Sequence, residues 1–190
     1  LSARWLFGAP AAGVATEIEA RLAPVSELPG WEGWRFGLHD DPGRPAVAVA
    51  AGPAADETGS AALDIAPPPA PQTSRPLLLT LIGRALAAAG RGVERAATRA
   101  VAPAAPLIGR RPRFEGDLDA GAVAEFDVAA VGPDLRETAL PRLSWTLSRL
   151  ETRWQWWSAG AGWRWEAVTT RARVAGGEIA VAPGAPARLA

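Results

Sequence analysis

The feature that most constrains the fold is the tryptophan-rich stretch Leu147–Thr170, which holds five of the nine tryptophans in the chain. Aromatic and polar side chains alternate on both sides of Ser158–Gly162, a segment of serine, alanine and glycine. Alternation with a period of two is typical of β-strands, and small residues with glycine favour a turn. The stretch therefore predicts a strand, a turn and a second strand. Each strand carries two tryptophans on one face, namely Trp154 and Trp156, and Trp163 and Trp165.

Length, charge and the absence of cysteine limit what the chain can be. Its 190 residues are 48% hydrophobic, enough for one large domain or two domains of about 90 to 100 residues. The net charge is zero, so the charge balance favours no nucleic-acid partner. Without cysteine the chain can form no disulfide, no cysteine-ligated zinc site and no iron–sulfur cluster.

The sequence shows no membrane span and no targeting segment. No apolar run reaches the roughly 18 residues that a transmembrane helix needs. The opening residues, Leu-Ser-Ala-Arg-Trp, are typical of the interior of a domain and unlike a signal peptide. We therefore expect a fragment of a larger protein.

Short alternating or aliphatic segments separated by glycine and proline predict strands along most of the chain. Segment 2–22 predicts a strand, a turn and a second strand, and segment 27–38 favours a loop packed on a sheet edge. Further strands are expected at residues 46–51, 61–65, 124–131, 143–149 and 174–181, with a connector at 101–109. Turn signals about every 8 to 12 residues are typical of β-sandwiches.

Residues 77–101 admit two interpretations. They could form an alanine-rich helix broken at Gly90–Gly92, or a hairpin that turns at the same glycines. A period-two pattern runs from Val93 to Val101, and Leu77–Ile82 is aliphatic without the polar face of a helix. These patterns favour the hairpin.

The tryptophan hairpin admits three interpretations. Flat apolar rings with polar edges suit the faces of sugars, so exposed rings could form a carbohydrate-binding platform. Alternatively, one row of rings fills the core of a β-sandwich while arginine stems partly cover the other row. The rings could also contact a neighbouring domain. The alternation favours the core interpretation.

Few residues could carry chemistry, and a structural role explains each of them better. His39 is the only histidine and precedes Asp40 and Asp41, so it could hold a metal or act as a base. The Pro-Gly that follows is typical of a turn instead. Three alternating carboxylates resemble a sparse calcium loop but lack its full spacing, namely Glu115, Asp117 and Asp119.

Two further patterns fall short of a site. Gly8–Gly13 is glycine-rich but lacks the lysine and the serine or threonine of a phosphate-binding loop. A single histidine, with no nucleophile elbow around a serine, argues against a catalytic triad. We predict no catalytic, cofactor-binding or metal-binding residue in this chain.

Five stretches, in order along the chain, share a pattern with one known family. They are ARWLFGAPAAG (3–13), PGWEGWRFGLHDD (29–41), ETGSAALDI (57–65), APLIGRRPRFEG (105–116) and LSWTLSRLETRWQWWSAGAGWRWEAVT (143–169). Together they resemble the macroglobulin domains of bacterial alpha-2-macroglobulins. Family members often carry tyrosine where this chain has Trp5 and Trp157, an exchange that keeps the ring and loses a hydroxyl.

The resemblance implies an all-β fold of two consecutive antiparallel β-sandwiches of the immunoglobulin or fibronectin-III type. We place these macroglobulin domains at residues 1–104, lacking the first strand, and 105–190, lacking the closing strands. Missing edges would leave backbone groups unpaired, so we expect modest stability in isolation or pairing between copies. The expected core or interface residues are Trp5, Phe7, Trp145 and Leu147.

The resemblance also implies a structural, non-enzymatic module of a broad-spectrum endopeptidase inhibitor of bacterial defence. In such inhibitors a bait segment is cut, the molecule rearranges, and a Cys–Gln thioester captures the protease; this chain has no cysteine and hence none of the thioester. The parent would be a periplasmic lipoprotein anchored to the inner membrane. The expected partners are neighbouring macroglobulin domains, target proteases and a peptidoglycan-synthesising penicillin-binding protein, with no nucleic acid and membrane contact only through the parental anchor.

Overall fold

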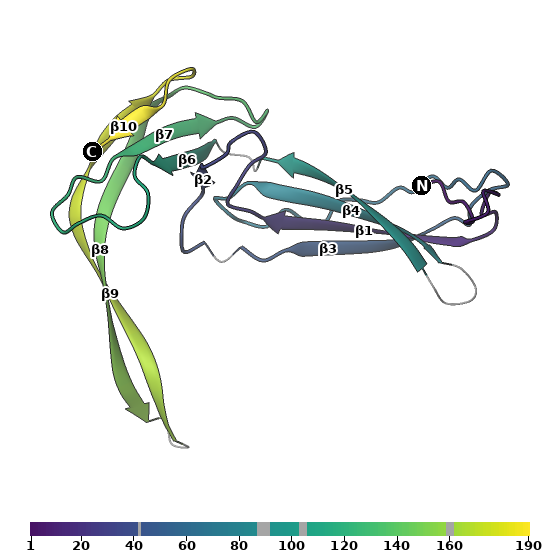
Figure 1. The fold of residues 1–190 in the computed structure, drawn as a ribbon, viewed down its shortest axis with the longest axis horizontal. Helices are drawn as coiled ribbons and strands as arrows, with labels where there is room; N and C mark the ends of the chain where they lie inside the picture. Colours follow the sequence, from purple (N-terminus) through teal and green to yellow (C-terminus); the bar gives the residue numbers. More distant parts are fainter. Residues whose placement is uncertain (42, 87–91, 103–105, 159–161) are drawn as a thin grey trace.

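The computed structural model describes residues 1–41, 43–86, 92–102, 106–158 and 162–190, and within these ranges it contains strands, turns and loops but no helix. The strands form two four-stranded sheets and one two-stranded ribbon, and every strand pairing is antiparallel (Figure 1). The predicted fold class, all-β with antiparallel strands, is confirmed.

The first sheet has the order β3-β1-β4-β5. Its strands are β1 (Ala15–Pro24), β3 (Ala46–Gly52), β4 (Leu77–Leu86) and β5 (Gly92–Val101). The last two strands pair with each other from Leu77 opposite Val101 to Leu86 opposite Gly92. The hairpin interpretation of residues 77–101 is therefore confirmed, although most of its turn, residues 87–91, lies outside the described residues.

The second sheet has the order β10-β7-β6-β2. Its strands are β2 (Arg35–Phe36), β6 (Leu107–Pro112), β7 (Phe126–Val131) and β10 (Ala187–Leu189). The short strand β2 comes from segment 27–38, which was expected to form a loop on a sheet edge. It lies at the edge of this sheet and pairs with β6, so a segment from the first half of the chain completes a sheet from the second half.

The remaining strands, β8 (Leu140–Ser158) and β9 (Trp163–Val181), form a long ribbon. The strand–turn–strand prediction for the tryptophan stretch is confirmed, with residues 159–161 outside the described part. The register shifts where Leu147 faces Ala175 and Ser148 faces Arg173, which leaves Val174 as an extra residue. We call the part before this bulge (140–147 and 175–181) the ribbon base and the part beyond it (148–158 and 163–173) the ribbon arm.

Two strand predictions near the N-terminus are wrong. Residues 61–65 join no sheet. The residue before them, Ser60, forms only an isolated bridge with Ser2. The prolines that follow have no backbone N–H to donate to a neighbouring strand. The first strand expected in segment 2–22 is also absent. Its residues form two isolated bridges instead, Ser2 with Ser60 and Arg4 with Pro10.

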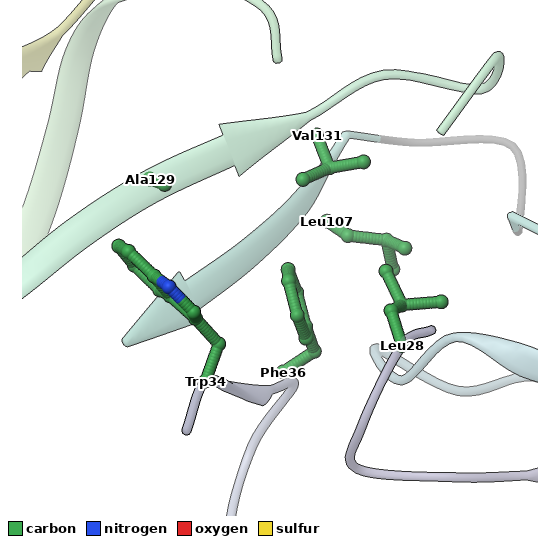
Figure 2. Close-up of a cluster of buried hydrophobic side chains, with 6 residues drawn as sticks. All are labelled: Leu28, Trp34, Phe36, Leu107, Ala129 and Val131. Atoms are coloured by element: carbon green, nitrogen blue, oxygen red, sulfur yellow. The ribbon is translucent and has the colours of Figure 1, made fainter. Parts of the chain in front are cut away.

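Six buried hydrophobic side chains gather between the two halves of the chain. This junction core consists of Leu28, Trp34, Phe36, Leu107, Ala129 and Val131 (Figure 2). Phe36 packs directly over Gly109, where a Cβ atom would lie 2.7 Å from the ring carbon Cε1. Trp31 meets the rings of Trp34 and Phe36 edge to face, at centroid distances of 5.4 and 5.5 Å.

The expected core residues are corrected by this arrangement. Phe7 is 81% exposed, and Trp5 and Leu147 are also exposed, while Trp145 is half-buried. Trp5 and Phe7 lie in an exposed turn, in which the Trp5 N–H donates to the carbonyl oxygen of Ala9 and the Gly8 N–H donates to the carbonyl oxygen of Trp5. None of these residues belongs to the buried core, which is built by segment 28–36 and strands β6 and β7 instead.

Candidate interaction surfaces

The junction between the two halves is held by hydrogen bonds as well as by the junction core. Arg110 on β6 donates from Nη1 to the carbonyl oxygen of Gly37 at 3.0 Å. Arg75 donates to the carbonyl oxygens of Leu38 and His39, which fixes the chain that follows β2. The loop 37–39 is therefore tied both to its own half of the chain and to the second sheet.

Asp41 is the most heavily hydrogen-bonded carboxylate of this loop. Its oxygens accept from the backbone N–H of Ser74 at 2.6 Å, the hydroxyl of Thr73 at 2.8 Å and the backbone N–H of Gly43 at 3.1 Å. These donors, the Ser74 N–H first, hold the pKa of Asp41 far below its usual range. A carboxylate so fully occupied closes a turn and is a poor base.

The adjacent carboxylate reaches the ribbon. Asp40 Oδ2 accepts from Nη2 of Arg171 on β9 at 3.2 Å, and this hydrogen bond lowers the pKa of Asp40. Both side chains are well exposed, so the pair contributes little to stability. Its significance is geometric, because it joins the loop of the first half to the start of the ribbon arm.

The buried charges are also paired. Asp127 on β7 is almost fully buried and accepts from Arg111 at 2.8 Å and from Arg113 at 3.1 Å. The Arg111 guanidinium, the larger influence, lowers the pKa of Asp127 and also stacks 4.9 Å from the ring centre of Trp34. These contacts stabilise the second sheet next to the junction core.

The ribbon arm carries four of its five tryptophans on one uncovered face. Trp156 and Trp165 are direct cross-strand partners, and Trp154 and Trp163 lie on the same face. The four rings are 54% to 71% exposed. The expectation that a row of rings fills a sandwich core is therefore wrong. The arm extends away from both four-stranded sheets, and no second sheet formed by the described residues faces it (Figure 1).

A hollow of about 620 Å³ lies at the ribbon base, between the base and the second sheet. Phe126 and Val128 line it from β7, and Leu143, Trp145 and Leu147 line it from β8. The half-buried ring of Trp145 is thus part of an apolar contact between ribbon and sheet.

Comparison with protein families matches both halves of the chain. Residues 1–103 match the bacterial alpha-2-macroglobulin MG5 domain, and residues 109–190 match bacterial macroglobulin domain 6. The chain belongs to the bacterial alpha-2-macroglobulin family. The alpha-2-macroglobulins of two Xylella fastidiosa strains, Temecula1 and 9a5c, are each 32% identical over 178 residues, covering 89% of this chain and 10% of the relative.

Solved alpha-2-macroglobulins have the same fold. The native conformation of the Escherichia coli protein matches with a TM-score of 0.73 at 23% identity, over 97% of this chain and 13% of that one. Salmonella alpha-2-macroglobulin reacted with methylamine matches with a TM-score of 0.75 at 21% identity, over 99% of this chain and 13% of that one. The chain thus spans about a tenth of the length of its curated alpha-2-macroglobulin relatives.

The candidates for chemistry lie apart in this macroglobulin pair. His39 occupies an exposed turn, and Gly8–Gly13 forms a turn in which Gly8 and Gly13 have positive φ. The carboxylates of the calcium-like segment are all exposed, namely Glu115, Asp117 and Asp119. Within the described residues, no three histidine, aspartate or glutamate side chains are placed to hold a metal ion, and no helix is long and apolar enough to cross a membrane.

Sequence reasoning missed the junction core of the macroglobulin pair. The signal was present in segment 27–38, where Trp34 and Phe36 alternate with arginine and glycine as in a short strand. Two strand residues are too few to be recognised by periodicity. β2 pairs with β6, Arg35 opposite Arg110 and Phe36 opposite Gly109. This contact between distant parts of the chain is tertiary, and no local pattern encodes it.

Proposed function

We propose that this chain is a structural, non-catalytic pair of macroglobulin units within a larger bacterial protease inhibitor that traps endopeptidases. The observation that carries the proposal is the junction core. Leu28, Trp34 and Phe36 come from the unit that matches the MG5 domain, and they are buried against residues of the unit that matches domain 6. The two units therefore share a hydrophobic core.

Rigidity suits a molecule that must transmit a rearrangement. Pulling segment 28–36 away from β6 and β7 would expose Phe36 and Leu107, each 1% exposed in the structure, at a cost of about 1.5 to 3 kcal/mol per side chain. A displacement applied to one unit would therefore move the other as well. This role requires packed sheets and paired charges, and it requires no acid or base of perturbed reactivity.

The location and partners of the parent are part of the proposal. Membership of the family supports a periplasmic lipoprotein of bacterial defence, held at the inner membrane by its own lipid. Neighbouring macroglobulin domains, target proteases and a penicillin-binding protein that synthesises peptidoglycan are the proposed partners.

Protease trapping is tested with the intact parent protein. A protease incubated with it should lose activity on a large protein substrate and keep activity on a small peptide. The surrounding inhibitor would block a large substrate from the active site of the trapped protease and let a small peptide through. Phe36→Ala, which loosens the junction core, should weaken this selective inhibition, whereas Phe7→Ala at an exposed site should not. Equal cleavage of the large substrate with and without the parent protein, across proteases of different specificity, would refute the proposal.

Carbohydrate binding is the second candidate, and the exposure of the four arm tryptophans favours it. Two observations weigh against it. Trp156 and Trp165 lie 4.5 Å apart at an angle of 35°, so they cover part of each other's faces and are not coplanar. The hollow at the ribbon base, about 620 Å³, is lined by other residues, among them Trp145 and Phe126. Titration with soluble bacterial glycans should leave the tryptophan fluorescence unchanged; saturable quenching lost in Trp154→Ala would favour a carbohydrate-binding module.

A further inference from the structure

The ribbon arm is an element whose own contacts do not explain its stability. Among the residues that the structure describes, the two strands beyond the bulge at Val174 pair only with each other, and β9 contacts β7 and β10. The ion pair between Arg171 and Asp40 is exposed. A two-stranded ribbon in water is marginally stable at best, so an arm of this length needs a further contact.

The two faces of the arm differ sharply. One face carries the four tryptophans with Ala167 and the hydrogen-bonded pair Thr152 and Thr169, and its charged residues, Arg171 and Arg173, lie only at the end next to the bulge. By register, the other face carries the five charged residues Arg149, Glu151, Arg153, Arg164 and Glu166, together with Gln155, Trp157 and Val168. The charged face suits water, and the tryptophan face suits a partner.

The size of the tryptophan face is that of an interface. Four indole rings at 54% to 71% exposure present roughly 600 Å² of aromatic surface, if one ring offers about 250 Å². That area equals the largest apolar patches of ordinary monomers, about 300 to 600 Å². It also supplies most of the roughly 800 Å² that one partner contributes to a stable interface.

We propose that the tryptophan face of the ribbon arm docks against a neighbouring domain of the same polypeptide, on an apolar patch bordered by carboxylates. Charge supports the border, because Arg171 and Arg173 lie on the tryptophan face at the end next to the bulge. The arm as a whole, with five arginines and two glutamates, has a net charge of +3 in a chain whose net charge is zero. Chain length supports the same-polypeptide partner, because this chain spans only 10% of its curated relatives. Domains joined in one chain meet at a high effective concentration.

This inference rests on the proposed function only in that the chain is a module of a larger protein. The absence of cysteine here allows single thiols to be placed on either face. Ala167→Cys lies on the tryptophan face opposite Trp154, and its neighbour Val168→Cys, the matched control, lies on the charged face opposite Arg153. Both variants are made in the intact parent protein, with Thr169→Cys as a second probe of the tryptophan face.

Native and urea-unfolded samples of each variant are labelled with a maleimide, and the labelling rate is followed on the peptide that contains the new cysteine. The rate in the native protein is then divided by the rate in concentrated urea. Docking predicts that Ala167→Cys and Thr169→Cys react at least about tenfold more slowly than Val168→Cys in the native protein, independent of protein concentration. Equal rates for the three cysteines would overturn the proposal. Protection that appears only at high protein concentration would assign the face to a second copy and would also overturn it.

The labelling and inhibition assays separate the two proposals. Equal labelling in a parent that still traps proteases would remove the docking inference and leave the proposed function standing. One-sided protection in a parent that fails to inhibit any protease would support docking and refute the proposed function.

Discussion

Replacing Phe36 by alanine tests most directly whether the two macroglobulin units share one core. The ring is 1% exposed and lies among Leu28, Trp34, Leu107 and Val131. Removing a buried phenylalanine ring costs about 3 to 5 kcal/mol, partly as lost burial and partly as a cavity. Gly109 lies directly beneath the ring and has no side chain to fill that cavity. We therefore expect a loss of about 4 kcal/mol in the free energy of unfolding.

The assay is urea unfolding followed by tryptophan fluorescence and by far-ultraviolet circular dichroism. The matched control is Phe7→Ala, because Phe7 is 81% exposed and its loss should change the unfolding free energy by less than about 0.5 kcal/mol. In the Phe36→Ala variant the two probes should also separate, since the units no longer unfold together. Equal midpoints for the two alanine variants would refute the reasoning, because the ring would then contribute no shared burial.

Two further predictions concern a turn and a buried carboxylate. Gly59 has φ of +78°, and a Cβ atom there would overlap the carbonyl oxygen of Ala3; Gly59→Ala should therefore cost about 2 to 4 kcal/mol in thermal unfolding. Gly116→Ala, at φ +69° with open space around it, should cost only about 1 to 2 kcal/mol from backbone strain, and equal losses at both sites would contradict the overlap. Because Arg111 lowers the pKa of folded Asp127, the stability from this pair is complete above the unfolded pKa of about 3.9 and lost as the pH falls through the lower folded pKa. Stability measured from pH 6 to about pH 2 should fall less steeply in Asp127→Asn, and parallel curves would contradict this assignment.

The sequence alone was sufficient for the strands whose side chains alternate over many residues. The hairpin of residues 77–101 and the ribbon of the tryptophan stretch were both predicted from a period of two, and both are present. Periodicity reports the faces of a strand, and long strands repeat the signal often enough to be unambiguous.

Only the tertiary structure decided which faces are covered. Trp34 and Trp156 both belong to alternating patterns, yet the first is buried in the junction core and the second is exposed on the ribbon arm. Alternation indicates which side chains share a face of a strand. Whether that face is buried depends on which distant segment of the chain packs against it. For Trp34 that segment is β6 and β7, whereas the arm extends past both sheets, so identical local patterns end in opposite environments.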